Sequence, residues 1–128
     1  MAGTLEGKSV LLVDDDQEIL GAMEVSFSSA GATVSKASDG NKAVETAVKE
    51  DPDLIVLDMM LPKRSGFLVL EQLKKGKPRN SKPHIIMITG NEGKRHQQYA
   101  LAIGAEDYLY KPFPMNRLME SAEKVLAE

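Results

Sequence analysis

The chain has 128 residues, a net charge of −3 and no cysteine, and its length suits one domain with a hydrophobic core of its own. The lack of cysteine excludes a disulfide framework and a thiolate metal site. The mildly acidic charge gives no general attraction to nucleic acid, so we expect no direct nucleic-acid binding. No apolar segment has the length of a membrane span or a signal peptide, so we expect a cytoplasmic protein without membrane insertion.

Short segments rich in β-branched residues alternate along the chain with longer segments of helical periodicity. Strands are predicted at residues 9–13, 33–37, 54–58, 84–89 and 107–110. A helical face follows each strand, formed in turn by Ile19, Met23, Phe27 and Ala30; by Ala43, Ala47 and Val48; by Phe67, Leu70 and Leu73; by Tyr99, Ala100 and Ile103; and by Met115, Leu118, Ala122 and Val125.

The alternation predicts an α/β fold with a single doubly wound parallel sheet of five strands and helices on both faces. The first, third and fourth strands are almost continuously apolar, which is typical of strands covered on both faces, whereas the second and fifth are more polar, as expected at sheet edges. Right-handed crossovers then favour the strand order 2-1-3-4-5 of flavodoxin-like folds. We expect one domain over residues 1–128, with its core at about 8–127, and a mobile polar loop at 75–83.

Polar side chains follow four of the predicted strands, at the end of the sheet where open parallel folds bind ligands. They are Asp14, Asp15 and Asp16 after the first strand, Asp58 at the end of the third, Thr89 at the end of the fourth and Lys111 after the fifth. Carboxylates packed side by side repel one another unless a cation lies among them, and an all-oxygen site suits Mg²⁺. With a lysine and a hydroxyl nearby to bind phosphoryl oxygens, the set indicates phosphoryl transfer onto an aspartate.

The blocks LLVDDD, LIVLDMMLP, MITG and YLYKPF resemble the signature of the two-component response-regulator receiver domain, and they occur in that family's order. Asp15 and Asp58 are 43 residues apart, Thr89 follows Asp58 by 31, and Lys111 follows Thr89 by 22, which is also the family's spacing. One block alone is a weak signal, but four together are specific, and the resemblance covers nearly the whole chain.

The resemblance implies that Asp58 accepts a phosphoryl group from a histidine kinase or a phosphotransfer protein. Mg²⁺ (or Mn²⁺) would be held by Asp15, Asp58 and the backbone carbonyl of Met60, and by Asp14 through water. Such a domain is a phosphoacceptor switch that promotes its own phosphorylation and dephosphorylation, rather than an enzyme acting on an outside substrate.

The resemblance also implies how the switch is read. Thr89 and Lys111 would bind the phosphoryl group, Tyr108 would turn inward as the aromatic switch, and Met60 and Asn91 would flank the attacking water. The Lys111–Pro112 peptide would be cis.

The resemblance also implies an output face. A downstream target protein, or a second copy of the chain, would bind the face formed by the helix after 89, the strand 107–110 and the last helix. On that face we expect Lys94, Arg95, Gln98, Tyr99, Glu106, Tyr108, Tyr110 and Arg117. We expect a stand-alone regulator of the chemotaxis type, although a receiver excised from a longer protein has the same sequence features.

Three alternatives stay open. Asp16 is expected to cap the first helix instead of binding an ion. The pattern Asp14-x-Asp16 is similar to the nucleophile motif of haloacid-dehalogenase-type phosphatases, which are Mg²⁺-dependent enzymes with an aspartyl phosphate, although Glu18 stands where that motif has threonine or valine. A third alternative is a receiver-like binding module that is never phosphorylated, against which the intact set of acids, threonine and lysine argues.

The loop after Asp58 departs from the family pattern. Arg64 and Ser65 stand where receivers commonly have an apolar and an acidic residue before the glycine. Lys63 and Arg64 place extra positive charge near the site, which favours an acidic partner or slows release of the phosphoryl group. His84 and His96 match no position of the site and are expected at the surface.

Overall fold

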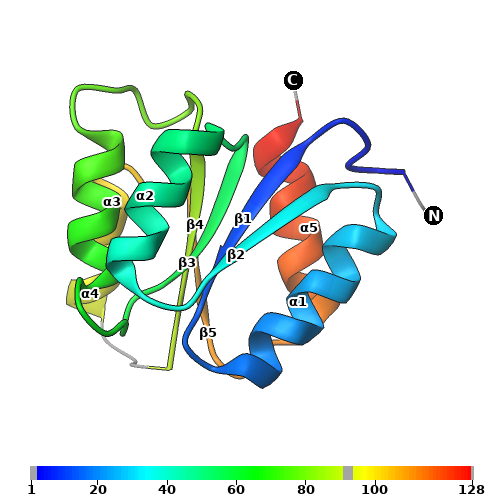
Figure 1. Cartoon of the computed structure of the whole chain (residues 1–128). Coiled ribbons are helices and arrows are strands. Elements are labelled where there is room, and N and C mark those ends of the chain that lie inside the picture. The colour runs from blue at the N-terminus through cyan, green and yellow to red at the C-terminus, as the bar shows by residue number, and fades with distance from the viewer. Residues whose placement is uncertain (1–2, 91–93, 128) are drawn as a thin grey trace.

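The protein, described here from a computed structural model that covers residues 3–90 and 94–127, alternates strands and helices along the chain (Figure 1). The strands are β1 (Ser9–Val13), β2 (Thr33–Ala37), β3 (Leu54–Asp58), β4 (His84–Thr89) and β5 (Asp107–Tyr110). The helices are α1 (Gln17–Ser29), α2 (Gly40–Glu50), α3 (Gly66–Lys74), α4 (Lys94–Ala102) and α5 (Met115–Leu126). All strands pair in parallel in the order β2-β1-β3-β4-β5, so the predicted strands, fold class and strand order are confirmed.

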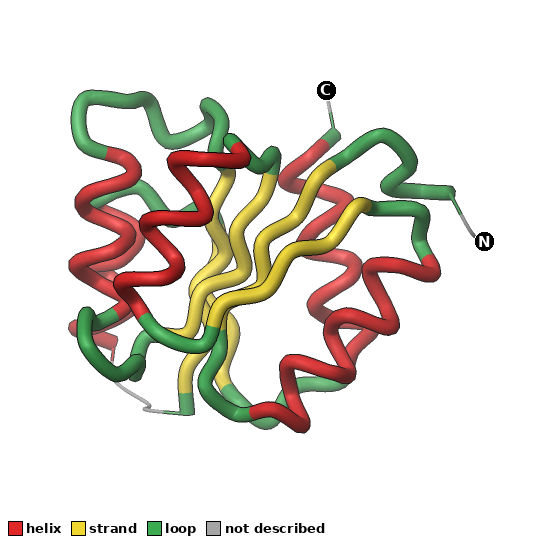
Figure 2. The backbone as a smooth tube through the Cα atoms, in the orientation of Figure 1, coloured by secondary structure: helices red, strands yellow, loops and turns green. Residues whose placement is uncertain are grey.

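The sheet separates two hydrophobic cores. Helices α1 and α5 lie on one face, and α2, α3 and α4 lie on the other (Figure 2). Every residue of the central strand β3 is buried, whereas the edge strand β2 is buried only at Ala37. The prediction for Val48 was wrong, because its side chain is 73% exposed while Ala43 and Ala47 are buried. At about 3.6 residues per turn, the position five after Ala43 points away from the core.

The helices that follow β1, β2 and β3 begin with side-chain caps at the carboxyl ends of these strands. Asp16 accepts hydrogen bonds from the N–H groups of Glu18 and Ile19, Asp39 caps α2, and Ser65 caps α3. Each cap satisfies a helix N–H that has no partner inside the helix. The predicted capping role of Asp16 is therefore confirmed. The first turns of these helices are held beside the loops that carry the polar residues of the site.

The loop 75–83 is tied to the fold by a lysine that the sequence patterns did not single out. Lys74, at the end of α3, is 3% exposed, and its Nζ donates hydrogen bonds to the carbonyls of Ser81 at 2.7 Å, Pro83 at 3.1 Å and Arg79 at 3.2 Å. Burial lowers the pKa of Lys74. The sequence-based expectation of a mobile loop did not include these hydrogen bonds from Lys74.

Replacing Lys74 with methionine keeps the aliphatic packing but leaves three carbonyls without their donor. We expect the free energy of unfolding to fall by about 1–3 kcal/mol, the cost of leaving buried polar groups unpaired. Urea unfolding followed by circular dichroism measures the change. Lys75→Met, at the exposed neighbouring position, is the matched control, and an equal loss in both variants would show that the carbonyl contacts do not stabilise the fold.

Candidate functional site

Two acidic residues extend from the end of β1 into the site. Asp14 is fully buried, and its Oδ1 accepts a hydrogen bond from the N–H of Asp16 at 2.9 Å. Asp15 is exposed. Each of Asp14, Asp15 and Asp58 offers a carboxylate oxygen, and these oxygens lie within 4.8 Å of one another. The predicted convergence of the acids from β1 and β3 is what the structure shows.

Asp58 ends the buried strand β3 and is only 3% exposed. Its Oδ1 accepts a hydrogen bond from the N–H of Met60 at 3.3 Å. Burial, followed by the neighbouring charge of Asp14, raises the pKa of Asp58 to about 6, although Lys111 and the Met60 N–H act in the opposite direction. At pH 7 the carboxylate is mostly ionised, but it lies in a site with excess negative charge.

Lys111 brings a positive charge into this site from the end of β5. Its Nζ lies 2.9 Å from Oδ2 of Asp14 and 3.6 Å from Oδ2 of Asp58. Burial disfavours the charged form of Lys111, but the hydrogen bond to Asp14 and the charge of Asp58 outweigh it and raise its pKa. The peptide between Lys111 and Pro112 is cis, as predicted, and a second cis peptide joins Lys82 and Pro83.

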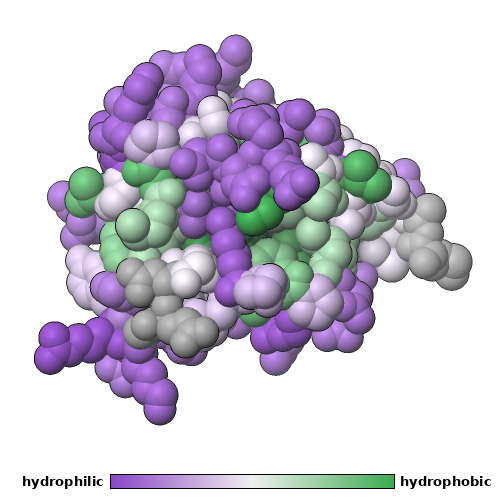
Figure 3. Space-filling view, turned by 90° about the horizontal axis from the view of Figure 1, so that it is seen from below, coloured by the Kyte–Doolittle hydropathy of each residue, from purple (hydrophilic) through white to green (hydrophobic). Residues whose placement is uncertain are grey.

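The carboxylates fit a hard divalent cation. Among the described residues, one lysine faces three carboxylates in this cluster, so the negative charge exceeds the positive charge there. Carboxylate oxygens are the ligands that Mg²⁺ prefers. In the view onto the carboxyl ends of the strands, hydrophilic residues cross the middle of the face and hydrophobic residues lie to either side (Figure 3).

Thr89 and Tyr108 lie on the neighbouring strands β4 and β5. Thr89 is fully buried at the end of β4, and its carbonyl accepts a hydrogen bond from the N–H of Lys111 at 2.7 Å. Tyr108 is 5% exposed, and its hydroxyl contacts Sδ of Met59 at 3.5 Å, next to Asp58 in the chain. Burial, and secondarily Tyr110, raises the pKa of Tyr108. The side chain of Tyr108 therefore points inward in this structure.

The expected output face is only partly exposed. Lys94, Arg95, Gln98, Tyr99 and Arg117 are exposed, whereas Tyr110 is half-buried with its hydroxyl on Gln97. Tyr108 points inward, and Glu106, directly before β5, shares a hydrogen bond of 2.5 Å between its Oε1 and Nδ1 of His84. His84, which was expected at the surface, is partly buried: its side chain is 18% exposed and contacts Glu106.

The loop after β3, residues 59–65, is tightly folded. The N–H of Gly66 donates to the carbonyl of Met59 at 2.9 Å, and the N–H of Arg64 donates to the carbonyl of Pro62 at 2.8 Å. Lys63, between Pro62 and Arg64, has a φ of 70°, so residues 62–64 form a γ-turn. The side chain of Met60 is exposed, while Asn91, the other predicted neighbour of the attacking water, lies outside the described residues.

The extra positive charges of this loop are engaged by neighbouring side chains. Nη1 of Arg64 donates to Oε1 of Gln72 at 2.5 Å, and Nζ of Lys63 lies 3.9 Å from Oδ2 of Asp39. The first contact directs Arg64 toward α3. The predicted effect of these charges on a partner therefore rests mainly on Lys63, whose side chain is 65% exposed.

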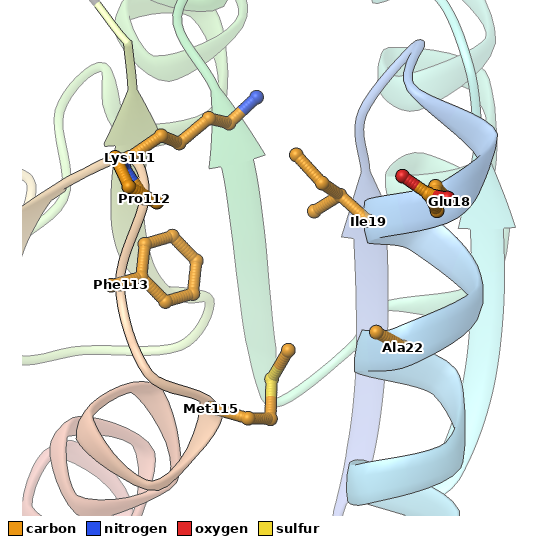
Figure 4. A pocket seen from close by; sticks show the side chains of 7 residues that line it. All are labelled: Glu18, Ile19, Ala22, Lys111, Pro112, Phe113 and Met115. Atoms are coloured by element: carbon orange, nitrogen blue, oxygen red, sulfur yellow. The ribbon is translucent and has the colours of Figure 1, made fainter.

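A pocket of about 470 Å³ adjoins the site between α1 and the segment after β5. Ile19 and Ala22 of α1 point toward Phe113 and Met115 across it, and Lys111 forms its rim on the side of the site (Figure 4). Its walls are mostly apolar.

The sequence profile of the response regulator receiver domain matches residues 10–123. The chain belongs to this family. The receiver is 36% identical over 119 residues to the alkaline phosphatase synthesis transcriptional regulatory protein PhoP of Bacillus subtilis, an alignment that covers 93% of this chain and 48% of PhoP. The receiver thus spans about half the length of that relative.

Solved receivers have the same fold. A putative response regulator from Chloroflexus aurantiacus superimposes with a TM-score of 0.84 at 28% identity, covering 94% of this receiver and 98% of that chain. The chemotaxis response regulator CheY4 of Vibrio cholerae superimposes with a TM-score of 0.81 at 29% identity, covering 93% of this receiver and 98% of that chain. The family resemblance is thereby confirmed.

The second acid of the phosphatase-type motif, Asp16, serves as a helix cap in this receiver. Asp16 is exposed, and Oδ1 of its carboxylate accepts hydrogen bonds from two N–H groups of α1. The structure also brings together residues that the sequence patterns did not connect, such as Met59 with Tyr108 and Gly40 with Pro62. Among the described residues, no helix is long and apolar enough to cross a membrane.

Proposed function

We propose that this receiver accepts a phosphoryl group on Asp58 from a histidine kinase or a phosphotransfer protein in a two-component phosphorelay. The observation that carries the proposal is the convergence of Asp14, Asp15 and Asp58 with Lys111, from the ends of three strands, at one edge of the sheet. A cytoplasmic location, and one receiver domain over residues 1–128, stay predictions.

The proposed chemistry is displacement at phosphorus. An ionised oxygen of Asp58 attacks the phosphorus of a phosphohistidine, a P–O bond forms, the P–N bond breaks, and the imidazole leaves with its electron pair. Mg²⁺ or Mn²⁺, held by Asp15, Asp58 and the Met60 carbonyl and by Asp14 through water, would neutralise charge on the phosphoryl oxygens. Lys111, already between Asp14 and Asp58, is placed to bind a phosphoryl oxygen, and the hydroxyl of Thr89 would bind another.

The switch is proposed to be a two-state equilibrium that the phosphoryl group biases through its contacts with Thr89 and Lys111. Both residues join the output side directly, because the Lys111 N–H is bonded to the Thr89 carbonyl and Thr89 pairs with Tyr110 in the sheet. We propose that α4, β5 and α5 then bind a downstream target protein or a second copy of the chain.

The phosphodonor is proposed to dock over the pocket between α1 and the segment after β5. Lys111 is part of both the pocket and the carboxylate cluster, so a protein seated on Ile19 and Phe113 covers the mouth of the site. The apolar lining suits the apolar face of a helix that carries the phosphohistidine.

Labelling with a small phosphodonor tests the proposal. We expect wild type incubated with Mg²⁺ and acetyl phosphate to gain the mass of one phosphoryl group, and Asp58→Asn to gain none. Asp16→Asn is the matched control, because asparagine caps a helix as well as aspartate, and it should label like wild type. If Asp58→Asn is still labelled and Asp14→Asn is not, the result would instead favour a phosphatase-type nucleophile at Asp14.

The phosphoryl group is expected to last for minutes or longer in the absence of a phosphatase. Met60 is exposed and follows Asp58 by two residues. The resemblance to receivers implies that this position flanks the attacking water, where an apolar side chain would hinder in-line approach. Decay of the labelled protein, followed by mass spectrometry after removal of acetyl phosphate, measures the lifetime. Met60→Ala should shorten it and Leu68→Ala, at another exposed apolar position, should not; decay of the wild type within seconds would contradict the prediction.

A further inference from the structure

The segment 37–40, from the last residue of β2 to the first residue of α2, is hydrogen-bonded to both loops that would hold the cation. At one end, the carbonyl of Ala37 accepts a hydrogen bond from the N–H of Asp14 at 3.2 Å. At the other end, the N–H of Gly40 donates to the carbonyl of Pro62 at 3.1 Å. The segment therefore spans from the acidic loop after β1 to the loop 59–65, which carries Met60. Both contacts are made by the backbone.

Gly40 is buried and leaves no room for a side chain. A Cβ at this position would overlap the carbonyl oxygen of Arg64, and it would lie 2.5 Å from Cβ and 2.7 Å from the carbonyl carbon of Arg64. These are backbone and Cβ atoms, which cannot rotate away as the end of a long side chain can. Because φ at Gly40 is outside the left-handed region, the close approach of the loop is what requires glycine here.

The loop 59–65 is built to transmit such a displacement. The hydrogen bond from Gly66 to Met59 closes its base, and the γ-turn centred on Lys63 fixes its tip. At Gly66 a Cβ would overlap the carbonyl oxygen of Asp58 and lie 2.8 Å from Cα of Met59, so the base is as closely packed as the tip. Because closely packed atoms transmit strain, we expect a displacement at the tip of this loop to reach its base.

We propose that Gly40 is a positioning residue for the site. Its close contact with Pro62 and Arg64 sets the separation between the Asp14–Asp15 loop and the Met60 loop, and so sets the affinity for the divalent cation and the rate of phosphorylation. Gly40 itself touches neither the cation nor the phosphoryl group. The inference rests on the proposed function of Asp58.

Gly40→Ala, compared with Gly21→Ala, tests the proposal. A Cβ at Gly21 in α1 would meet no atom within 4 Å, so this control reports the general effect of replacing glycine by alanine in a helix. In Gly40→Ala we expect the Kd for Mg²⁺, measured by calorimetry, to rise about 10-fold or more, as when other supports of metal ligands are removed. Labelling by acetyl phosphate at a fixed, subsaturating Mg²⁺ concentration should slow in parallel. Gly21→Ala should match wild type in both.

Unfolding measured in EDTA separates positioning from a purely structural role, because a loosened fold lowers the unfolding midpoint without changing the Mg²⁺ affinity of the folded protein. A folded Gly40→Ala with the wild-type Kd overturns the inference and leaves the proposed function intact. A wild type that neither binds Mg²⁺ nor is labelled overturns both.

If Gly40→Ala does not fold, amide NMR of the wild type decides. Saturating Mg²⁺ with beryllofluoride should shift the Gly40 amide signal and leave that of Gly21 in place. An unmoved Gly40 signal in a protein that binds both additives overturns the inference.

Discussion

Replacing Lys111 with methionine should lower the free energy of unfolding by about 3 kcal/mol at pH 7 in the absence of divalent cations. The Nζ of Lys111 lies 2.9 Å from Asp14, which is fully buried, and 3.6 Å from Asp58. Methionine keeps the aliphatic packing but removes the counter-charge, which leaves buried carboxylates uncompensated. The loss stays at the lower end of the range for a broken buried pair because Asp58, with a pKa of about 6, takes up a proton readily.

Urea unfolding with and without Mg²⁺ measures this effect. Mg²⁺ should stabilise Lys111→Met more than it stabilises wild type, because the cation then supplies the counter-charge that lysine no longer provides. Lys42→Met is the matched control: Lys42 pairs with Glu45 on the surface of α2, where both side chains are mostly exposed, and surface pairs contribute little. Equal destabilisation of the two variants would show that Lys111 does not balance the buried acids.

Asp58→Asn should stabilise the metal-free protein at pH 7 by about 2–3 kcal/mol. Burial and Asp14 raise the pKa of Asp58 in the folded protein from its ordinary value of 3.8 to about 6. The folded state therefore binds this proton more tightly than the unfolded chain does. The stability that Asp58 contributes is complete below pH 3.8, and it is lost as the pH rises through 6.

The pH dependence distinguishes this effect from a general change in packing. Wild type and Asp58→Asn should be nearly equal in stability near pH 4 and should diverge up to pH 7, and Mg²⁺ should narrow the gap because it binds the ionised site of the wild type. Asp16→Asn, at an exposed helix cap, should follow the wild-type curve. A constant offset between wild type and Asp58→Asn at every pH would contradict the electrostatic explanation.

Much of this fold was predictable because burial leaves a periodic signal in the sequence. The runs at 54–58 and 84–89 are apolar at nearly every position because β3 and β4 are covered on both faces, and the more polar 33–37 and 107–110 became the edges. The convergence of Asp15, Asp58 and Lys111 followed from the rule that all parallel strands end at the same side of the sheet.

The contacts that escaped prediction join residues far apart in the chain through partners that periodicity does not identify. Tyr108 contacts Met59 across 49 positions, and His84 pairs with Glu106 across 22. A pattern of apolar and polar residues indicates which side chains are buried, but it does not reveal which ones meet. Gly40 was overlooked for a related reason, because a backbone contact leaves no side-chain signal.

The sheet places the residues of the pocket and the contact between Met59 and Tyr108 in different hydrophobic cores. Met59 and Tyr108 belong to the core beneath α2, α3 and α4, whereas Ile19, Phe113 and Met115, which line the pocket beside the site, pack against the core beneath α1 and α5. Ile19 and Phe113 therefore lie on the opposite face of the sheet from Met59 and Tyr108. During evolution, the α1 side of the pocket can therefore change to suit a new signalling partner, while the contact between Met59 and Tyr108 lies in the core on the opposite face of the sheet.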